Sequence, residues 1–484
     1  MKLLFVTSEM HPLAKTGGLG DVSHALPLAL HHEGLDVRVL LPGYRSVLSQ
    51  LKQVEPVCTL DALAALQPQA RLLSAQLPGT RLPLFVLDCP ALYDRPGTPY
   101  QSPAGEDWED NPQRFGVLCH AAAWLGGPRS TLPWHPDVVH CNDWQAGLVP
   151  ALFKLQEGSG ARTVTTIHNL AFQGNFDPAW VSRLELPAYS FHMHGVEFYG
   201  RLSFLKAGIN YADKITTVSP RYAQEIQTPA FGCGLEGLLQ HRRGDLSGIL
   251  NGIDSAWNPG RDPALPARFD ARHLIPGKAQ NKALLQRALG LKQDPAVPLL
   301  GMVTRLTYQK GIDLLLEALP ELMRLPLQLA ILGSGEAEME RRLLTAGTTY
   351  PARLSVTRAF DENLSHRIIA GSDLFLMPSR FEPCGLAQMY AMAYGTPPVA
   401  RSTGGLADTI TDCTPETLSD KTATGFLFEN PDAAALVTAV RRALETYAVK
   451  KSWRPLQRSG MTRDFSWSRA ARQYLQVYRT LQGA

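Results

Sequence analysis

Two cations lie close together in the second half of the chain, where an apolar run leads into a helical pattern. Arg305 follows the run 299–304, and Lys310 and Gly311 precede the helix. Cationic side chains beside the N–H groups of a helix N-terminus are well suited to phosphate. The spacing therefore predicts a phosphate site; the alternative is a pair of solvated surface charges.

A carboxylate lies further along, in the turn 379–386. Glu382 stands there between Ser379 and the pair Cys384 and Gly385. The helical pattern that follows has a regular apolar face of Leu386, Met389, Tyr390 and Ala393. A carboxylate at this position can stabilise the helix N-terminus through its charge, or it can bind the hydroxyl groups of a sugar.

A glycine-rich helix start follows the apolar run 398–400. Thr403, Gly404 and Gly405 occupy it. Small residues at a helix start leave the backbone N–H groups accessible to an anion. This segment is therefore a second candidate for contact with phosphate.

A similar loop occurs near the N-terminus, between the first expected strand and the first helix. Lys15 precedes Gly17 and Gly18 in this loop. The dinucleotide-binding pattern G-x-G-x-x-G is not complete, because Ser23 stands where its last glycine would be. The lysine favours a diphosphate or a sugar next to one, and the alternative is a structural tight turn.

Two further strand ends in the first half carry polar side chains. Asp143 precedes Trp144, and His168 precedes the polar loop 173–175. A carboxylate beside an aromatic ring suits a sugar, but an N-cap aspartate and a structural histidine would give the same pattern. Ligands of α/β folds bind at the carboxyl ends of parallel strands, so these positions together indicate a shared cleft.

The elements that must position these residues alternate along the chain. Short apolar runs alternate with helical patterns, which predicts parallel sheets with crossover helices. The expected strands of the first half are 3–7, 37–41, 138–141, 163–167 and 214–219. The pattern restarts with 248–250, 299–304, 327–332, 354–357, 373–377 and 398–400, after a linker within 241–266. The chain is therefore expected to form two Rossmann-like domains, with an amphipathic helix from Trp467 onward at its end.

Charge and composition exclude several classes of protein. Lys and Arg number 47 against 44 Asp and Glu, so the net charge is +3, and no strongly basic run marks a nucleic-acid binder. No apolar stretch is long enough for a membrane helix or a signal peptide. The seven cysteines lack C-x-x-C spacing, which indicates free thiols in the cytoplasm. The sequence offers no Asp-x-Asp pair for a metal, the nearest run being Asp107-Trp108-Glu109.

Five motifs, in this order, resemble the bacterial glycogen synthases and plant starch synthases. They are Lys15-Thr16-Gly17-Gly18-Leu19-Gly20-Asp21-Val22, Asn251-Gly252-Ile253-Asp254, Arg305-Leu306-Thr307 with Gln309-Lys310-Gly311, Ser379 to Leu386, and Thr403-Gly404-Gly405-Leu406. The resemblance extends from residue 1 to the terminal helix. Because nothing resembling a transit peptide precedes the first strand, the chain looks like the bacterial members.

The resemblance implies an α/β protein with the GT-B glycosyltransferase fold, in which two Rossmann-like domains face each other across a deep cleft. The implied domains are 1–245 on the acceptor side, 246–460 for the nucleotide-sugar donor, and 461–484 as a helix crossing back to the first domain. The implied reaction is the retaining transfer of glucose from ADP-glucose to the non-reducing end of an α-1,4-glucan such as glycogen. Neither a cofactor nor a metal is implied, and neither nucleic acid nor membrane is a partner.

The resemblance also assigns roles to individual residues. Glu382, His168, Asp143, Lys310 and Arg305 are the expected catalytic residues. The expected contacts to ADP-glucose are Lys15, Gly17, Gly18, Asn251, Arg305, Lys310, Phe360, Ser379, Cys384, Gly385, Thr403, Gly404 and Gly405. Phe360 occupies the place of an aromatic ring that stacks on adenine, where the family often has Tyr.

One position separates the chain from many other retaining GT-B enzymes. Tyr390 stands eight residues after Glu382, where those enzymes carry a second Glu. A double displacement through two carboxylates therefore lacks its partner, and front-face substitution is the expected mechanism. The alternatives are a non-catalytic glucan-binding relative, a nucleotide-sugar epimerase of similar architecture, and a dehydrogenase, the last disfavoured by the broken glycine pattern.

Overall fold

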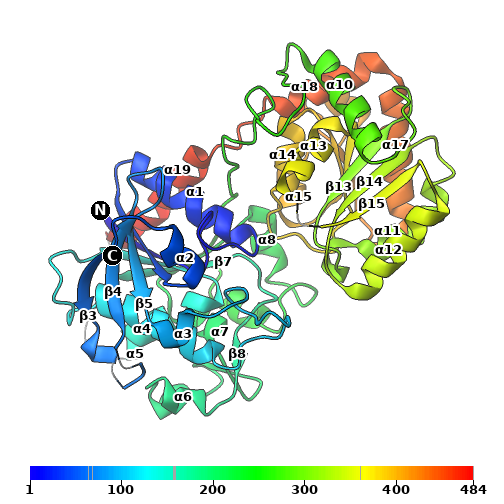
Figure 1. Ribbon diagram of the computed structural model, residues 1–484. Coiled ribbons are helices and arrows are strands. Elements are labelled where there is room, and N and C mark those ends of the chain that lie inside the picture. The colour runs from blue at the N-terminus through cyan, green and yellow to red at the C-terminus, as the bar shows by residue number, and fades with distance from the viewer. Residues whose placement is uncertain (64, 68, 156–159, 360, 483–484) are drawn as a thin grey trace. The chain divides into compact units, whose positions relative to one another are not determined.

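The computed structural model describes residues 1–63, 65–67, 69–155, 160–359 and 361–482. The chain forms two compact units (Figure 1): Met1–Asn251 together with Trp467–Ala484, and Gly252–Ser466. Both divisions fall a few residues beyond the boundaries suggested by the sequence, at 245 and 460. Each unit has its own central sheet and its own apolar core.

The first unit is built on a sheet with the strand order β12-β11-β7-β6-β1-β2-β5-β4-β3. Its strands are β1 (Lys2–Val6), β2 (Asp36–Pro42), β3 (Glu55–Thr59), β4 (Arg71–Gln76), β5 (Pro83–Asp88), β6 (Val138–Asn142), β7 (Arg162–Ile167), β11 (Lys214–Thr217) and β12 (Leu246–Gly248). Neighbours from β12 to β5 pair in parallel, whereas β4 runs antiparallel to β5 and β3. A small antiparallel sheet of β8 (Asn175–Phe176), β10 (Arg201–Ser203) and β9 (Glu197–Phe198) is separate from it.

Helices follow the parallel strands of the first unit. They are α1 (Gly18–His32), α2 (Arg45–Gln50), α3 (Pro90–Tyr93), α4 (Asn111–Gly126), α5 (Leu148–Leu155), α6 (Trp180–Arg183), α7 (Phe204–Tyr211), α8 (Pro220–Glu225), α9 (Glu236–His241) and α19 (Trp467–Gln482), with 3-10 turns η1 (Asp61–Leu63), η2 (Trp144–Ala146) and η3 (Ala188–Ser190). Strand β1 is apolar on both faces, and Leu3 to Val6 are fully buried. Continuous burial is typical of a parallel strand covered by helices on both faces.

The last helix, α19, packs against α1, as the red and blue ribbons in Figure 1 show. Its apolar face of Trp467, Ala470, Ala471, Tyr474, Leu475 and Tyr478 is buried, which confirms the amphipathic helix expected there. Tyr478 OH lies 2.7 Å from Nδ1 of His140 on β6. The apolar face of α19 is therefore part of the core of the first unit.

The second unit is built on a parallel sheet with the order β15-β14-β13-β16-β17-β18. Its strands are β13 (Leu299–Val303), β14 (Gln328–Gly333), β15 (Leu354–Arg358), β16 (Leu374–Met377), β17 (Pro398–Arg401) and β18 (Phe426–Phe428). Its helices are α10 (Leu274–Ala288), α11 (Ile312–Leu322), α12 (Ala337–Thr349), α13 (Glu362–Gly371), α14 (Ala387–Ala393), α15 (Gly404–Thr409), α16 (Pro415–Ser419), α17 (Ala433–Ala448) and α18 (Lys450–Met461), with the 3-10 turn η4 (Tyr308–Lys310).

The alternation of strands and helices is confirmed in both units, with one strand placed in the wrong half. The run 248–250 was expected to open the second sheet. Instead β12 lies in the first sheet, where Leu246 pairs in parallel with Ile215 of β11. Pairing between residues far apart in the chain determines which sheet a strand joins, and a local sequence pattern carries no information about that pairing. Within the described ranges, no helix combines the length and the apolar character needed to cross a membrane.

Candidate active site

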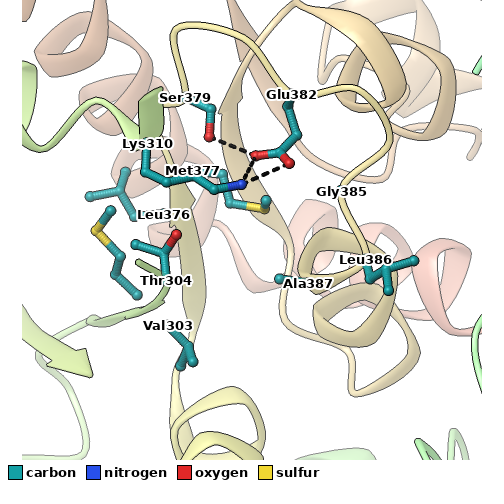
Figure 2. A pocket seen from close by; sticks show the side chains of 11 residues that line it. Val303, Thr304, Lys310, Leu376, Met377, Ser379, Glu382, Gly385, Leu386 and Ala387 are labelled. Carbon is teal, nitrogen blue, oxygen red and sulfur yellow. Dashed lines mark hydrogen bonds and ion pairs between the residues drawn. The ribbon is translucent and has the colours of Figure 1, made fainter. Parts of the chain in front are cut away.

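A pocket lies at the carboxyl ends of β13 and β16, which are neighbours in the second sheet. It is lined by Met302, Val303, Thr304, Lys310, Leu376, Met377, Ser379, Glu382, Gly385, Leu386 and Ala387 (Figure 2). This edge is where α/β folds bind ligands. The structure therefore brings four of the expected site residues, Lys310, Ser379, Glu382 and Gly385, into one pocket.

Lys310 and Glu382 form an ion pair in this pocket. The Lys310 ammonium Nζ donates to both carboxylate oxygens of Glu382, at 2.8 Å and 2.6 Å. Ser379 Oγ donates to Oε2 of the same carboxylate at 2.9 Å. The side chains of Lys310 and Glu382 are 16% and 7% exposed, so water screens the pair only weakly. The partners of Glu382 are thus side chains, which argues against a simple cap of α14.

The turn before α11 brings Lys310 to the pocket. Gly311 adopts the left-handed conformation with φ of +69°, and a Cβ there would lie 2.0 Å from the Pro378 carbonyl oxygen. Only glycine permits this approach. The Arg380 N–H donates to the Gln309 carbonyl at 2.9 Å, and the Arg380 guanidinium pairs with Asp313 at 2.5 Å. These contacts fix the loop that carries Lys310 against the loop that carries Glu382.

The glycine-rich start of α15 packs against the backbone of the loop that carries Glu382. A Cβ on Gly404 would lie 2.0 Å from the Glu382 carbonyl oxygen, and one on Gly405 would lie 2.0 Å from that of Cys384. The Gly405 N–H donates to the Glu382 carbonyl at 3.1 Å. Thr403 and Cys384 are buried beside them. The Gly405 N–H expected to face phosphate is therefore engaged within the protein.

Arg305, an expected donor contact, does not line this pocket. Arg305 is exposed, and its Nη2 lies 3.5 Å from Gln309 Oε1. Lys310, the last residue of the 3-10 turn η4, lines the pocket, whereas Arg305 does not. Phe360 lies outside the described residues.

In the first unit, the backbone N–H groups of the loop before α1 donate to a carboxylate of the protein itself, that of Glu9. The carboxylate of Glu9, which is 3% exposed, accepts from the N–H groups of Thr16 and Gly17 at 2.6 Å and 3.2 Å. Tyr100 OH donates to it at 2.5 Å. Lys15 pairs with Asp21 at 2.7 Å instead. The sequence pattern did not single out Glu9, which lies three residues beyond the end of β1 at Val6.

Asp143 and His168 lie together at the adjacent ends of β6 and β7. Asp143 Oδ1 accepts from the His168 N–H at 2.7 Å, and His168 Nε2 lies 2.9 Å from Asn142 Oδ1. Burial raises the pKa of Asp143 to about 7, and the nearby Glu9 charge adds to this effect. Burial lowers the pKa of His168 to about 3, so the imidazole is neutral at neutral pH. Asp143 also has φ of +55°, an unusual conformation that is common at functional sites.

Asn251 is the last residue of the first unit's main segment and is 6% exposed. Among the described residues its Oδ1 has no hydrogen-bond partner. A buried amide oxygen without a partner is costly to the fold, so it fits the ligand contact expected of Asn251.

Asp143 makes the stability of the first unit depend on pH. An unfolded aspartate ionises near pH 3.9. Because the folded pKa is raised to about 7, the folded state keeps a proton that the unfolded state has lost, and stability falls as pH rises through that window. Asn keeps an oxygen for the His168 N–H but does not titrate. We expect Asp143→Asn to raise the melting temperature relative to wild type more at pH 8 than at pH 5. Equal differences at the two pH values would contradict the raised pKa.

Two Rossmann-like units, one of which holds a cation and a carboxylate in a pocket at its sheet edge, are typical of glycosyltransferases, and two family models place the chain in that class. Residues 2–241 match the starch synthase catalytic domain, and residues 287–458 match glycosyl transferases group 1.

The most informative relatives match over the whole chain. The glycogen synthase of Nitrosospira multiformis is 52% identical, with 99% of this chain and 97% of the relative covered. That of Aromatoleum aromaticum is 52% identical, with 100% and 98% covered. The catalytic domain of starch synthase IV from Arabidopsis thaliana, solved with ADP and acarbose, is 32% identical with a TM-score of 0.88, and the match covers 100% of this chain and 99% of that one. The chain belongs to the bacterial glycogen synthase family and has its GT-B fold, as the sequence motifs indicated.

Proposed function

We propose that this chain transfers glucose from ADP-glucose to the non-reducing end of an α-1,4-glucan, with retention of the anomeric configuration, and so lengthens glycogen. The observation that carries the proposal is the buried pair of Lys310 and Glu382, in a chain whose full length matches glycogen synthases. The starch synthase solved with ADP and acarbose supports both parts of the proposal, the nucleotide-sugar donor and the glucan acceptor.

The pocket suggests how the donor is held. Lys310 neutralises the diphosphate as it leaves, and Arg305 adds charge from the exposed loop. Glu382, oriented by Ser379, binds the glucose while positive charge develops on it. The other expected donor contacts remain part of the proposal: Lys15, Gly17, Gly18, Asn251, Phe360, Cys384, Gly385, Thr403, Gly404 and Gly405. Asp143 and His168 serve the acceptor side, in the first unit.

Tyr390 bears on the mechanism. Its ring stacks on Trp257 with centroids 3.8 Å apart, at the position where a second carboxylate would stand. We therefore favour front-face substitution. The bond from the anomeric carbon to the diphosphate oxygen breaks, an oxocarbenium-like sugar forms, and the acceptor's 4-hydroxyl oxygen bonds to the same face. The leaving diphosphate oxygen takes the hydroxyl proton.

Incubation with ADP-[14C]glucose and glycogen tests the proposal. We expect label in the polymer, and we expect β-amylase to release it as labelled maltose, because that enzyme acts on α-1,4 bonds from the non-reducing end. A parallel reaction with UDP-glucose measures the preference between donors. Label that stays in small molecules would contradict the proposal and favour a non-catalytic relative or an epimerase.

We also propose that transfer needs no metal ion. In the described part of the chain, no group of three or more His, Cys, Asp or Glu side chains is placed to bind one. Cationic side chains can neutralise the leaving diphosphate instead. We expect transfer to continue at an unchanged rate in excess EDTA. Loss of transfer in EDTA that Mg²⁺ restores would contradict this expectation.

The proposed compartment is the cytoplasm. All seven cysteines are free thiols, and five of them are buried: Cys89, Cys119, Cys141, Cys384 and Cys413. Free thiols are typical of proteins that work in a reducing compartment.

A further inference from the structure

Among the described residues of the first unit, three large aromatic side chains are exposed: Phe172, Tyr189, which is 68% exposed, and Tyr199. Phe172 is 51% exposed and Tyr199 is 81% exposed. Phe172 follows β7, in the loop after His168, and Tyr199 lies in the turn between β9 and β10. Together with Gln173, Cys233 and Gly234, they form a surface that we call the aromatic rim.

Contacts join these residues into one surface. Gln173 Nε2 donates to the Cys233 carbonyl at 3.0 Å. The Tyr199 ring lies against Gly234, where a Cβ would be 3.2 Å from its Cε2. The aromatic rim therefore runs from the loop after β7 to the β9–β10 turn.

The aromatic rim begins close in the chain to the candidate acceptor residues, since Phe172 lies four residues after His168. The residue after Gln173 is Gly174, and a Cβ on it would lie 2.5 Å from Cε3 of Trp144. Trp144 is the neighbour of Asp143. The loop that carries Phe172 and Gln173 therefore packs against the neighbour of Asp143.

Tyr199 occupies its turn at a conformational cost. Tyr199 has φ of +48° and Gly200 has φ of +76°, so both residues of a two-residue hairpin turn are left-handed. Asn-Gly is the preferred sequence for such a turn, and a bulky residue at positive φ is a genuine outlier. The ring contacts Phe198 with a centroid distance of 4.7 Å, but it is 81% exposed, so burial contributes little to its presence.

We propose that the aromatic rim binds the α-1,4-glucan acceptor beyond its reacting end, an inference that rests on the proposed function. All five rim residues are uncharged, which suits a neutral polysaccharide better than a nucleotide or an acidic partner. Aromatic faces pack against the apolar faces of pyranose rings, and the Tyr199 hydroxyl can exchange hydrogen bonds with sugar hydroxyls. The rim thus contributes to the affinity for the glucan polymer and does not affect the binding of the sugar donor.

The test uses the full-length protein with Tyr199→Asn and Phe172→Ala. Asn suits the turn better than Tyr, so Tyr199→Asn should keep or raise the melting temperature. We expect each variant to weaken glycogen binding about fivefold or more, measured as retardation in native gels that contain glycogen. The KM for glycogen should rise equally, while the KM for ADP-glucose and kcat with saturating maltotriose stay unchanged. Ile275→Asn, at a 46% exposed apolar residue on α10 of the second unit, is the matched control and should bind glycogen normally.

The outcomes separate this inference from the proposed function. If the wild type transfers glucose but both rim variants bind glycogen as it does, the rim is not a glucan site. If they bind normally but sediment as smaller species than the wild type, the rim joins two copies of the chain, and the inference is likewise overturned. A wild type that transfers no glucose would instead overturn the proposed function.

Discussion

Glu382→Gln is expected to lower kcat by at least about a hundredfold, equivalent to some 2.7 kcal/mol in the activation barrier. Gln keeps the shape of the side chain and an oxygen that accepts from Lys310 and Ser379, which now bind the carboxylate at 2.6 Å and 2.9 Å. It removes the negative charge that would stabilise the developing positive charge on glucose. The affinity for ADP should therefore change little. The melting temperature should fall, but less than when Lys310 is removed, because the Gln oxygen still accepts a hydrogen bond from the Lys310 ammonium, whose side chain is 16% exposed.

The competing interpretation is that Glu382 only stabilises a helix N-terminus. Losing such a contact costs about 0.3–2 kcal/mol of stability and no activity in the folded enzyme. A matched control is Glu338→Gln, since Glu338 belongs to an ion pair with Arg341 whose side chains are 64% and 66% exposed. This control should keep both activity and melting temperature. A Glu382→Gln protein that melts much earlier yet turns over normally would establish the structural role.

Most of the central strands could be predicted from the sequence because each is marked by a short apolar run of neighbouring residues. Leu3 to Val6 form a continuous apolar run, and burial on both faces requires one. The antiparallel edge strands were not expected, since β3 contains Glu55 and Pro56 and is largely exposed. β12 was assigned to the wrong sheet because its pairing with Ile215 joins distant parts of the chain.

In the candidate site, too, the sequence did not show which distant residues contact each other. The helix-start pattern found Lys310 and Glu382 separately, but nothing in it shows that residues 72 positions apart form an ion pair. The glycine pattern suggested N–H groups open to phosphate, whereas at Gly405 the glycine permits close approach to the Glu382 loop. Glu9 lies near the carboxyl end of a parallel strand, where ligands of α/β folds bind, so the sequence could have indicated it. Its bonds to Thr16 and Gly17 depend on the fold of the loop, which the sequence alone does not define.

Lys310→Met is expected to lower kcat/KM roughly ten- to a hundredfold. Hydrogen bonds to charged groups contribute about 1.5–3 kcal/mol, and each 1.36 kcal/mol corresponds to tenfold in rate. The structure adds an effect on stability, because the substitution leaves the Glu382 carboxylate, whose side chain is 7% exposed, without its cation. Removing one partner of a buried pair costs up to about 3–5 kcal/mol, with the upper end reserved for full burial. The single variant should therefore melt earlier as well as react more slowly.

The double variant Lys310→Met with Glu382→Gln separates these two effects. It removes the unpaired buried charge, so its melting temperature should return most of the way to that of the wild type. Its activity should stay low, since neither the diphosphate nor the glucose meets its charged partner. Arg341→Met, which breaks the exposed pair with Glu338, should leave both quantities unchanged, because such surface pairs contribute at most about 1 kcal/mol. If Lys310→Met has wild-type kinetics and an unchanged melting curve, Lys310 is a solvated surface charge and the proposed diphosphate contact is wrong.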